Sequence, residues 1–244
     1  MYQSVRNAPT RTRPVRTRAN TESSMTHSPG EPDPRAEMRL QLLHAALPHV
    51  PFDGWSQKAL DRAADDIGVD RDVARLMFPE GAVEMIALFS ARADEAMTAA
   101  LLARPLAGLK VRERVALAVR LRIEANVEHR EAARRAVAFL ALPQHAPRGM
   151  RLAFDTADAI WRALGDAATD YNYYTKRLIL AGVFSATVVY WLDDDSDGFA
   201  DTWGFLERRI GDVMTFEKTK AKMSKLGEKA TEAVRWFGHR RYGS

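Results

Sequence analysis

The sequence of 244 residues contains no cysteine. Disulfide bonds, zinc sites with thiolate ligands and a cysteine nucleophile are therefore excluded. The sequence also has few long apolar runs. The longest, from Leu178 to Leu192, has about 15 residues, whereas a helix that spans a bilayer needs roughly 20. We therefore expect a protein that is soluble or peripheral to a membrane.

The signatures of common catalytic sites are missing as well. The sequence contains no G-x-S-x-G, no G-x-x-x-x-G-K and no dinucleotide-binding glycine fingerprint. Its six histidines show neither the HExxH nor the Glu-x-x-His spacing of metal sites. The sequence thus gives little support to an enzyme, and we predict no catalytic residue, no cofactor and no metal.

One acidic loop, DDDSDG at 193–198, matches the first positions of a calcium-binding loop. The twelfth position of such a loop requires a glutamate that binds through both oxygens, and here it is Gly204. We predict instead an acidic turn in which Asp197 caps a helix from Phe199 to Met214.

Helical periodicity runs through most of the chain from Ala36 onwards, and no stretch shows the two-residue alternation of a strand. Capping residues, glycines and prolines predict an all-α fold of nine or ten helices. The expected helices cover 36–47, 57–67, 71–78, 82–103, 111–142 (as one helix or two), 150–164, 170–192, 199–214 and a last segment from 216.

Composition and charge divide the chain into four parts. Residues 1–35 are poor in apolar residues and carry six arginines against three carboxylates, so we expect a disordered basic tail. Residues 36–81 are expected to form a helix-turn-helix-like unit, and 82–215 a helical domain. Residues 216–244 carry eight basic residues against three glutamates. An acidic body with basic ends suits a protein whose ends meet an anionic surface.

The three short helices expected over 36–78 have the layout of a helix-turn-helix. DNA binding depends largely on the neutralisation of phosphates. Between Ser56 and Glu80, however, four basic residues stand against six carboxylates, and the expected recognition helix begins Asp70-Arg71-Asp72. The shape thus suggests a DNA-binding unit, whereas the charge argues against binding to nucleic acid.

The last segment, 216–244, has the pattern of an amphipathic helix with a basic side. Such a helix is typical of proteins that lie on a membrane surface, but a final helix packed on its own domain has the same pattern. The apolar stripe consists of Phe216, Met223, Leu226, Ala230, Val234 and Phe237, and the lysines beside it are Lys218, Lys222, Lys225 and Lys229.

The stretch TDYNYYTKRLILAGVF at 169–184 begins a helix with a polar, aromatic entrance. Tyr173, Lys176 and Arg177 lie at this entrance, and the helix is apolar all round from Leu178 onwards. A helix of this kind is buried on every side, which predicts a central helix, a dimer seam or the wall of an apolar cavity. Small residues would let another helix approach closely: Ala181, Gly182, Ser185 and Ala186.

Two dense blocks of this region resemble the Coq-nine family of ubiquinone-biosynthesis accessory proteins. The first block runs from Asp170 to Arg177 and the second, DTWGFLERRI, covers 201–210. The upstream ADAIW, with Asp158, Ile160 and Trp161, also fits the family, and the resemblance extends over about residues 36–223. One departure is Tyr173, where the family favours tryptophan.

The resemblance implies a fold like that of the TetR repressors, with a helical ligand domain that forms a homodimer. It implies an apolar pocket for a lipid, either an isoprenoid quinone or a phospholipid, and no catalysis by this protein. It also implies support for the di-iron hydroxylase that acts on demethoxy-ubiquinone, and a C-terminal helix that engages the membrane surface. The expected location is a bacterial cytoplasm, peripheral to the inner membrane, or alternatively the matrix side of the mitochondrial inner membrane.

On this basis we assign candidate site residues. The lipid pocket is assigned to Tyr174, Leu180, Phe184, Val188 and Trp191. The partner patch for the hydroxylase is assigned to Asp158, Ile160, Trp161, Tyr173, Lys176 and Arg177, and the membrane helix to the apolar stripe and lysines of 216–244 given above.

The residues leave alternatives open. In the patch, Tyr173 and Trp161 can simply pack together while Arg177 bridges Asp170. For the whole protein, a ligand-responsive TetR-type repressor predicts binding to duplex DNA through the first 80 residues. A scaffold without lipid predicts an interior filled with side chains.

Overall fold

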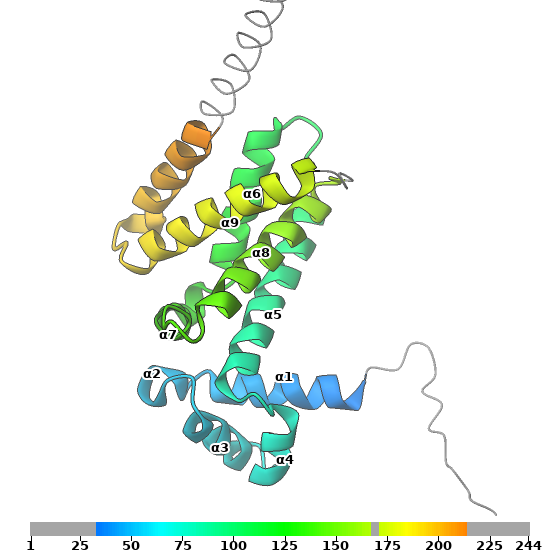
Figure 1. Ribbon diagram of the computed structural model, residues 1–244, viewed down its shortest axis with the longest axis vertical. Helices are drawn as coiled ribbons and strands as arrows, with labels where there is room; N and C mark the ends of the chain where they lie inside the picture. The colour runs from blue at the N-terminus through cyan, green and yellow to red at the C-terminus, as the bar shows by residue number, and fades with distance from the viewer. Residues whose placement is uncertain (1–32, 167–170, 214–244) are drawn as a thin grey trace, which may run out of the picture. The chain divides into compact units, whose positions relative to one another are not determined.

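The computed structural model describes residues 33–166 and 171–213, and every regular element in these ranges is helical (Figure 1). Nine α-helices and a further helix over 200–213 confirm the predicted all-α fold. The helices are α1 (Pro34–Ala46), α2 (Val50–Asp53), α3 (Gln57–Asp66), α4 (Arg71–Met77), α5 (Ala82–Leu102), α6 (Val111–Glu124), α7 (Arg130–Leu140), α8 (Ala146–Ala163) and α9 (Tyr171–Leu192). Short 3₁₀ turns lie at Val127–His129 and Asp197–Phe199.

The helix-turn-helix-like unit is built from α1, α3 and α4, which pack on one another. The predicted caps are confirmed: the Ser56 hydroxyl accepts a hydrogen bond from the Ala59 N–H at 3.3 Å, and Asp70 accepts from two N–H groups at the start of α4. The sequence reading missed α2. It took Pro51 as a helix breaker, but Pro51 lies in the first turn of α2, where no N–H is needed.

The stretch 111–142, which was left open as one helix or two, forms α6 and α7, separated by the 3₁₀ turn. The next helix, α8, begins at Ala146, four residues before the expected Met150. Here too a proline, Pro147, occupies the first helical turn instead of preventing it.

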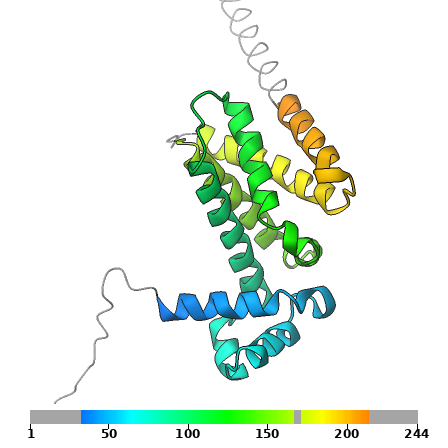
Figure 2. The ribbon, with the colours of Figure 1, turned by 180° about the vertical axis from the view of Figure 1, so that it is seen from behind.

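One hydrophobic core connects the first four helices with the rest of the described chain. It includes Leu42 on α1 and Leu206 on the helix over 200–213. Helix α5 packs against α1, α6 and α8, and Figures 1 and 2 show it running from the α1–α4 unit into the upper bundle. The buried Trp55 donates its indole N–H to the Ala132 carbonyl of α7 at 2.9 Å. The expected boundary between residues 81 and 82 is the start of α5, and the core continues across it.

The loop after α9 is organised by Asp194. Its buried carboxylate accepts hydrogen bonds from the N–H groups of Ser196 and Thr202, each at 2.8 Å, and from the Thr202 hydroxyl at 2.5 Å. Although burial disfavours its charge, these donors hold the pKa of Asp194 well below its usual range. The prediction that Asp197 caps the following helix was wrong, because Asp197 lies inside the 3₁₀ turn and Ser196 precedes it.

Candidate functional site

An apolar cavity of about 370 Å³ lies among helices α5 to α9. Ligand pockets have volumes of roughly 300–1,000 Å³, so this cavity is at the small end of that range. Of the predicted pocket residues, Phe184, Val188 and Trp191 line it. Leu180 is buried in the core without lining the cavity, and Tyr174 is 61 % exposed. The structure thus places three of the five predicted residues at the cavity.

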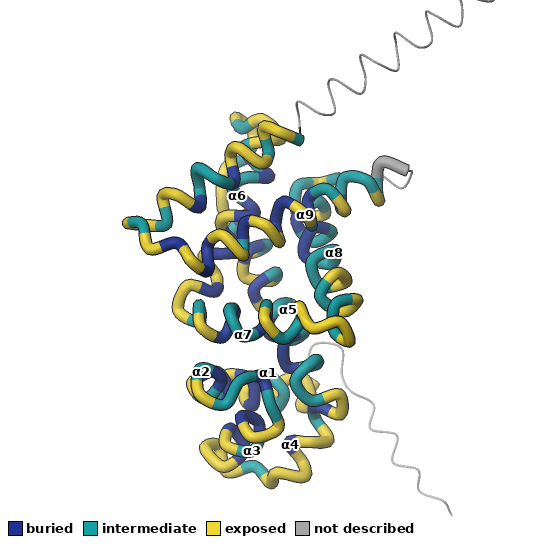
Figure 3. The backbone as a smooth tube through the Cα atoms, turned by 60° about the vertical axis from the view of Figure 1, so that its left-hand side comes forward, coloured by how far each residue is buried: buried dark blue, intermediate teal, exposed yellow. Residues whose placement is uncertain are grey.

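The cavity has a buried inner end and an exposed mouth. Ile86 and Ile123 at the inner end are buried, whereas Met150 and Val189 at the mouth are 73 % and 53 % exposed. Figure 3 shows that α8 and α9 each carry both buried and exposed residues. Sequence reasoning missed the walls contributed by α5 to α8, because a cavity and a filled core use the same apolar side chains.

A second candidate site lies where the entrance of α9 packs against the end of α8, and Arg177 is at its centre. The Arg177 side chain is 1 % exposed. Its Nε donates to Asp158 at 2.6 Å, and its Nη1 donates to Asp166 at 3.3 Å. The guanidinium also lies 3.5 Å above the centre of the Tyr173 ring. A buried cation is thus surrounded by two carboxylates and an aromatic face.

The neighbouring side chains complete this cluster. The Tyr173 hydroxyl donates to Asp158 at 3.0 Å, and the Lys176 ammonium donates to Asp166 at 2.9 Å. The ammonium also lies 5.3 Å from the centre of the Trp161 ring. Among the described residues, Lys176 and not Tyr173 therefore packs against the Trp161 ring. The alternative partner of Arg177, Asp170, lies outside the described residues.

The carboxylates and the guanidinium hold one another in the charged form. A hydrogen bond from Lys176 lowers the pKa of Asp166. Burial alone would raise the pKa of Asp158, but the hydrogen bonds from Arg177 and Tyr173 outweigh it and lower the pKa. Burial likewise opposes the charge of Arg177, and its bond to Asp158 raises its pKa nonetheless. The two carboxylates and the guanidinium are therefore charged at neutral pH.

The predicted patch separates into a surface and a support. Ile160 and Arg177 are buried, so a partner cannot touch them in this conformation. Trp161, Tyr173 and Lys176 are half-buried and form the accessible part, which we call the α8–α9 patch. Sequence reasoning missed Asp166 and also Arg162, which pairs with Asp158 at 2.8 Å. The spacing of four residues between 158 and 162 was the available signal.

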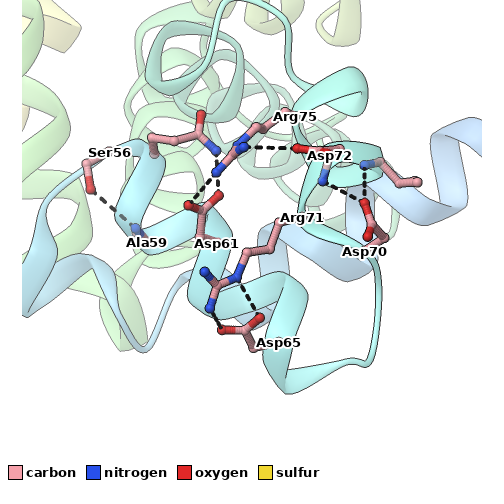
Figure 4. Close-up of polar contacts among 10 residues, drawn as sticks. Ser56, Ala59, Asp61, Asp65, Asp70, Arg71, Asp72 and Arg75 are labelled. Atoms are coloured by element: carbon pink, nitrogen blue, oxygen red, sulfur yellow. Dashed lines mark hydrogen bonds and ion pairs between the residues drawn. The ribbon is translucent and has the colours of Figure 1, made fainter.

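In the helix-turn-helix-like unit, the arginines of α4 form ion pairs with carboxylates of the same unit (Figure 4). Arg71 on α4 donates two hydrogen bonds to Asp65, at 2.9 and 2.6 Å. Arg75 bridges Asp61 on α3 and Asp72 on its own helix. The two arginines of the expected recognition helix are therefore paired with carboxylates of the same unit, which leaves little positive charge for a phosphate.

Among the described residues, one stretch is long and apolar enough to cross a membrane by length and composition, Tyr173–Leu192 of α9, and 44 % of it is buried. We expected no stretch long enough to span a bilayer, because the apolar run alone is too short. The stretch of 20 residues is longer because it also includes Lys176 and Arg177. One side of α9 packs against α8, but Leu178, Val189 and Tyr190 are exposed. The prediction that this helix is buried on every side is therefore wrong for the single chain.

Comparison with known proteins finds relatives that match most of this chain. The family model COQ9 matches residues 146–217, which include α8 and α9. The mitochondrial ubiquinone biosynthesis protein COQ9 of Bos taurus is 32 % identical over 213 residues, which are 84 % of this chain and 66 % of the bovine protein. For Homo sapiens COQ9 the identity is 31 %, over 84 % of this chain and 67 % of the human protein. The chain thus spans about two thirds of the length of these relatives.

A solved structure shows a similar fold. The TetR transcriptional regulator from Nitrosomonas europaea matches with a TM-score of 0.58 and 19 % identity, over 72 % of this chain and 97 % of the regulator. The expected TetR-like fold is therefore confirmed. Because the sequence relatives cover most of the chain and include both blocks that we identified, this protein belongs to the COQ9 family.

Proposed function

We propose that this protein takes part in ubiquinone biosynthesis as a lipid-binding accessory protein without catalytic activity. In this proposal it presents an isoprenoid quinone intermediate to the demethoxy-ubiquinone hydroxylase at a membrane surface. The observation that carries the proposal is the apolar cavity, whose wall is formed in part by α9, the helix of the first family block. The names of the curated relatives support the pathway.

The size of the cavity fits a partial enclosure of such a lipid. Each CH₂ group removed from water is worth about 0.8 kcal/mol, so a polyprenyl chain does not leave the bilayer without an apolar path. A volume of about 370 Å³ accommodates a ring and a short piece of chain. The exposed Met150 and Val189 at the mouth would cover the next part of the chain.

The lipid part of the proposal is tested on the purified protein. We expect native mass spectrometry and organic extraction to find bound isoprenoid quinone or phospholipid. The same protein after delipidation should take up quinone from liposomes. A protein that emerges without lipid and takes up none would overturn the carrier role and favour the lipid-free scaffold.

For the hydroxylase we propose the α8–α9 patch as the docking surface, because protein interfaces are enriched in tryptophan and tyrosine and this patch carries Trp161 and Tyr173. Trp161→Ala should weaken the complex with the hydroxylase by about tenfold or more in a binding assay. The matched control is Trp203→Ala, which also removes a half-buried indole, one held by the Gly198 carbonyl at 2.9 Å. An equal loss of affinity in both variants would show that removal of any half-buried indole weakens the complex, and that the patch has no special role.

A homodimer is proposed from the exposed face of α9. Leu178 is exposed on this helix, and the small residues Gly182 and Ala186 follow it at intervals of four residues and are also exposed. A Cβ atom added at Gly182 would meet no atom within 4 Å, so the face is open in the single chain. Sedimentation equilibrium measures the assembly directly, and a monomer at micromolar concentration would contradict this proposal.

We propose no nucleic-acid partner, because Arg71 and Arg75 are paired within their own unit. Salt-sensitive binding to a DNA duplex would instead support the repressor. For the compartment, both proposed locations place the protein beside an inner membrane. The mitochondrial names of the relatives favour the matrix side over the bacterial cytoplasm.

A further inference from the structure

The connection between α5 and α6 presents apolar and basic side chains together on the surface. Helix α5 ends at Leu102 and α6 begins at Val111, and the two helices pack against each other. Leu102 is 69 % exposed and Val111 is 61 % exposed. Arg104 and Lys110 lie between them in the sequence and are also exposed. We call residues 102–114 the α5–α6 tip.

The cations of the tip are not neutralised by the protein itself. Within residues 33–166 and 171–213, neither Arg104 nor Lys110 forms an ion pair. Many other exposed arginines of the described chain are paired, as Arg71 is with Asp65. The tip as a whole carries four basic residues against one glutamate. It is therefore a cationic spot on a protein whose body is acidic.

Hydrogen bonds within the tip fix its backbone and occupy its one carboxylate. The Nε of Arg114 donates to the Leu109 carbonyl at 2.9 Å. Glu113 accepts a hydrogen bond from the backbone N–H of Lys110 at 2.9 Å, and its other oxygen lies 3.9 Å from Arg112. Glu113 thus holds the start of α6, and the side-chain charges of Arg104 and Lys110 remain free for a partner.

The tip lies at the end of the bundle from which the basic C-terminal segment departs. The helix over 200–213 runs beside α6 in the opposite direction, and the Arg120 guanidinium of α6 lies 4.8 Å above the Trp203 ring. Figures 1 and 2 show the end of that helix and the α5–α6 tip at the same end of the bundle, with α4 at the other end. Residues 216–244 follow directly on this helix.

We propose that the α5–α6 tip is a second contact with an anionic bilayer. Leu102 and Val111 enter the head-group region, while Arg104 and Lys110 bind lipid phosphates. A bilayer is favoured over a protein partner, because protein interfaces are enriched in aromatic residues and depleted in lysine, and the tip has no aromatic residue. This inference rests on the membrane-surface location in the proposed function. It adds an orientation, in which the tip faces the bilayer and the helix-turn-helix-like unit points away from it.

The test places a polarity-sensitive dye at the tip of the full chain. Because the sequence has no cysteine, Leu102→Cys creates a single labelling site. We expect the emission of the dye to rise and to shift to shorter wavelength when liposomes that contain phosphatidylglycerol are added. The matched control is Leu76→Cys on α4, because Leu76 is 68 % exposed at the opposite end of the molecule. The dye at position 76 should not respond.

A charge variant tests the cations separately by liposome flotation. Each basic residue near an anionic leaflet strengthens binding about fivefold, so the double variant Arg104→Gln with Lys110→Gln should bind about 25-fold more weakly. The control double variant is Arg62→Gln with Arg71→Gln, which removes the same charge from the helix-turn-helix-like unit, where both arginines are paired with carboxylates. This control should bind almost as the unsubstituted protein does.

The outcomes separate this inference from the proposed function. If the unsubstituted full chain binds no anionic liposomes, the membrane location in the proposed function fails. If it binds and the dye at position 102 does not respond, or responds as the dye at 76 does, the proposed function stands and the tip contact is refuted. Weaker binding of the Arg104 and Lys110 variant without a dye response would refute the insertion of the tip. If Leu102→Cys does not fold, Val111→Cys gives the same comparison.

Discussion

Asp158→Ala should lower the free energy of unfolding by about 3 kcal/mol at pH 7. The substitution leaves the guanidinium of Arg177 buried with Asp166 as its remaining carboxylate, at 3.3 Å instead of 2.6 Å. It also removes the acceptor of the Tyr173 hydroxyl. A buried charge that loses its closest partner costs far more than an exposed one, because water cannot replace the partner. Urea unfolding, followed by circular dichroism, measures the difference.

Asp155→Ala is the matched control, on the same helix and three residues earlier. Within residues 33–166 and 171–213, Asp155 forms its ion pair with the exposed Arg151, one turn away. Exposed pairs of this kind contribute about 0.5 kcal/mol or less. If the two variants lose equal stability, then Asp166 alone compensates Arg177 and our account of the cluster is wrong.

The pH dependence gives an independent check. The pKa of Asp158 and that of Asp166 lie below the value of 3.8 that applies to the unfolded chain. A carboxyl group with a lowered folded-state pKa stabilises the protein above the unfolded pKa, and this stability is lost as the pH falls through the folded pKa. The unsubstituted protein should therefore lose stability between about pH 5 and pH 2 more steeply than Asp158→Ala does. If the stability of the two proteins falls with pH at the same slope, the pH dependence does not come from Asp158 and our assignment is wrong.

Removal of residues 216–244 should abolish binding to anionic liposomes while the helical core stays folded. These residues lie outside the described ranges, so the prediction rests on their sequence. The segment carries a net charge of +5 and an apolar stripe. Each basic residue near an anionic leaflet adds roughly 1 kcal/mol, and burial of the stripe adds further binding energy. Liposome flotation measures the bound fraction.

A variant that loses charge but keeps the apolar stripe separates the electrostatic from the apolar contribution to liposome binding. Replacement of Lys222, Lys225 and Lys229 by glutamine keeps the stripe and should weaken binding by about 100-fold. Liposomes without anionic lipid should show little effect of this change. If the truncated protein binds as the full chain does, membrane contact belongs to another surface, and the exposed face of α9 becomes the first candidate.

Local sequence rules predicted the helices well, because caps and periodicity act over a few residues. Ser56 and Asp70 cap the helices that we expected them to cap. The errors also have local causes. Pro51 was read as the end of a helix although it begins one, and Asp197 was chosen as a cap although Asp194 accepts the hydrogen bonds.

The candidate site depended on contacts that no local rule contains. Helical spacing places Tyr173 beside Arg177, and the structure shows these two side chains in contact. That Arg177 is buried and that Asp166 is its second partner follow only from the packing of α8 on α9. The wall of the cavity was predicted only on α9, because residues such as Ser90 and Asn126 come together through helices far apart in sequence.

The hydrogen bond from Trp55 to the Ala132 carbonyl indicates a structural role for the first four helices. A unit that moves about a hinge needs an interface whose contacts can break and form again in a second arrangement. Here the interface is a buried indole fixed to the backbone of α7, within a core that continues along α5. Both α5 and α7 are walls of the cavity. A unit with the layout of a DNA-binding domain is therefore fixed to two of the helices that line the cavity, and it supports their positions.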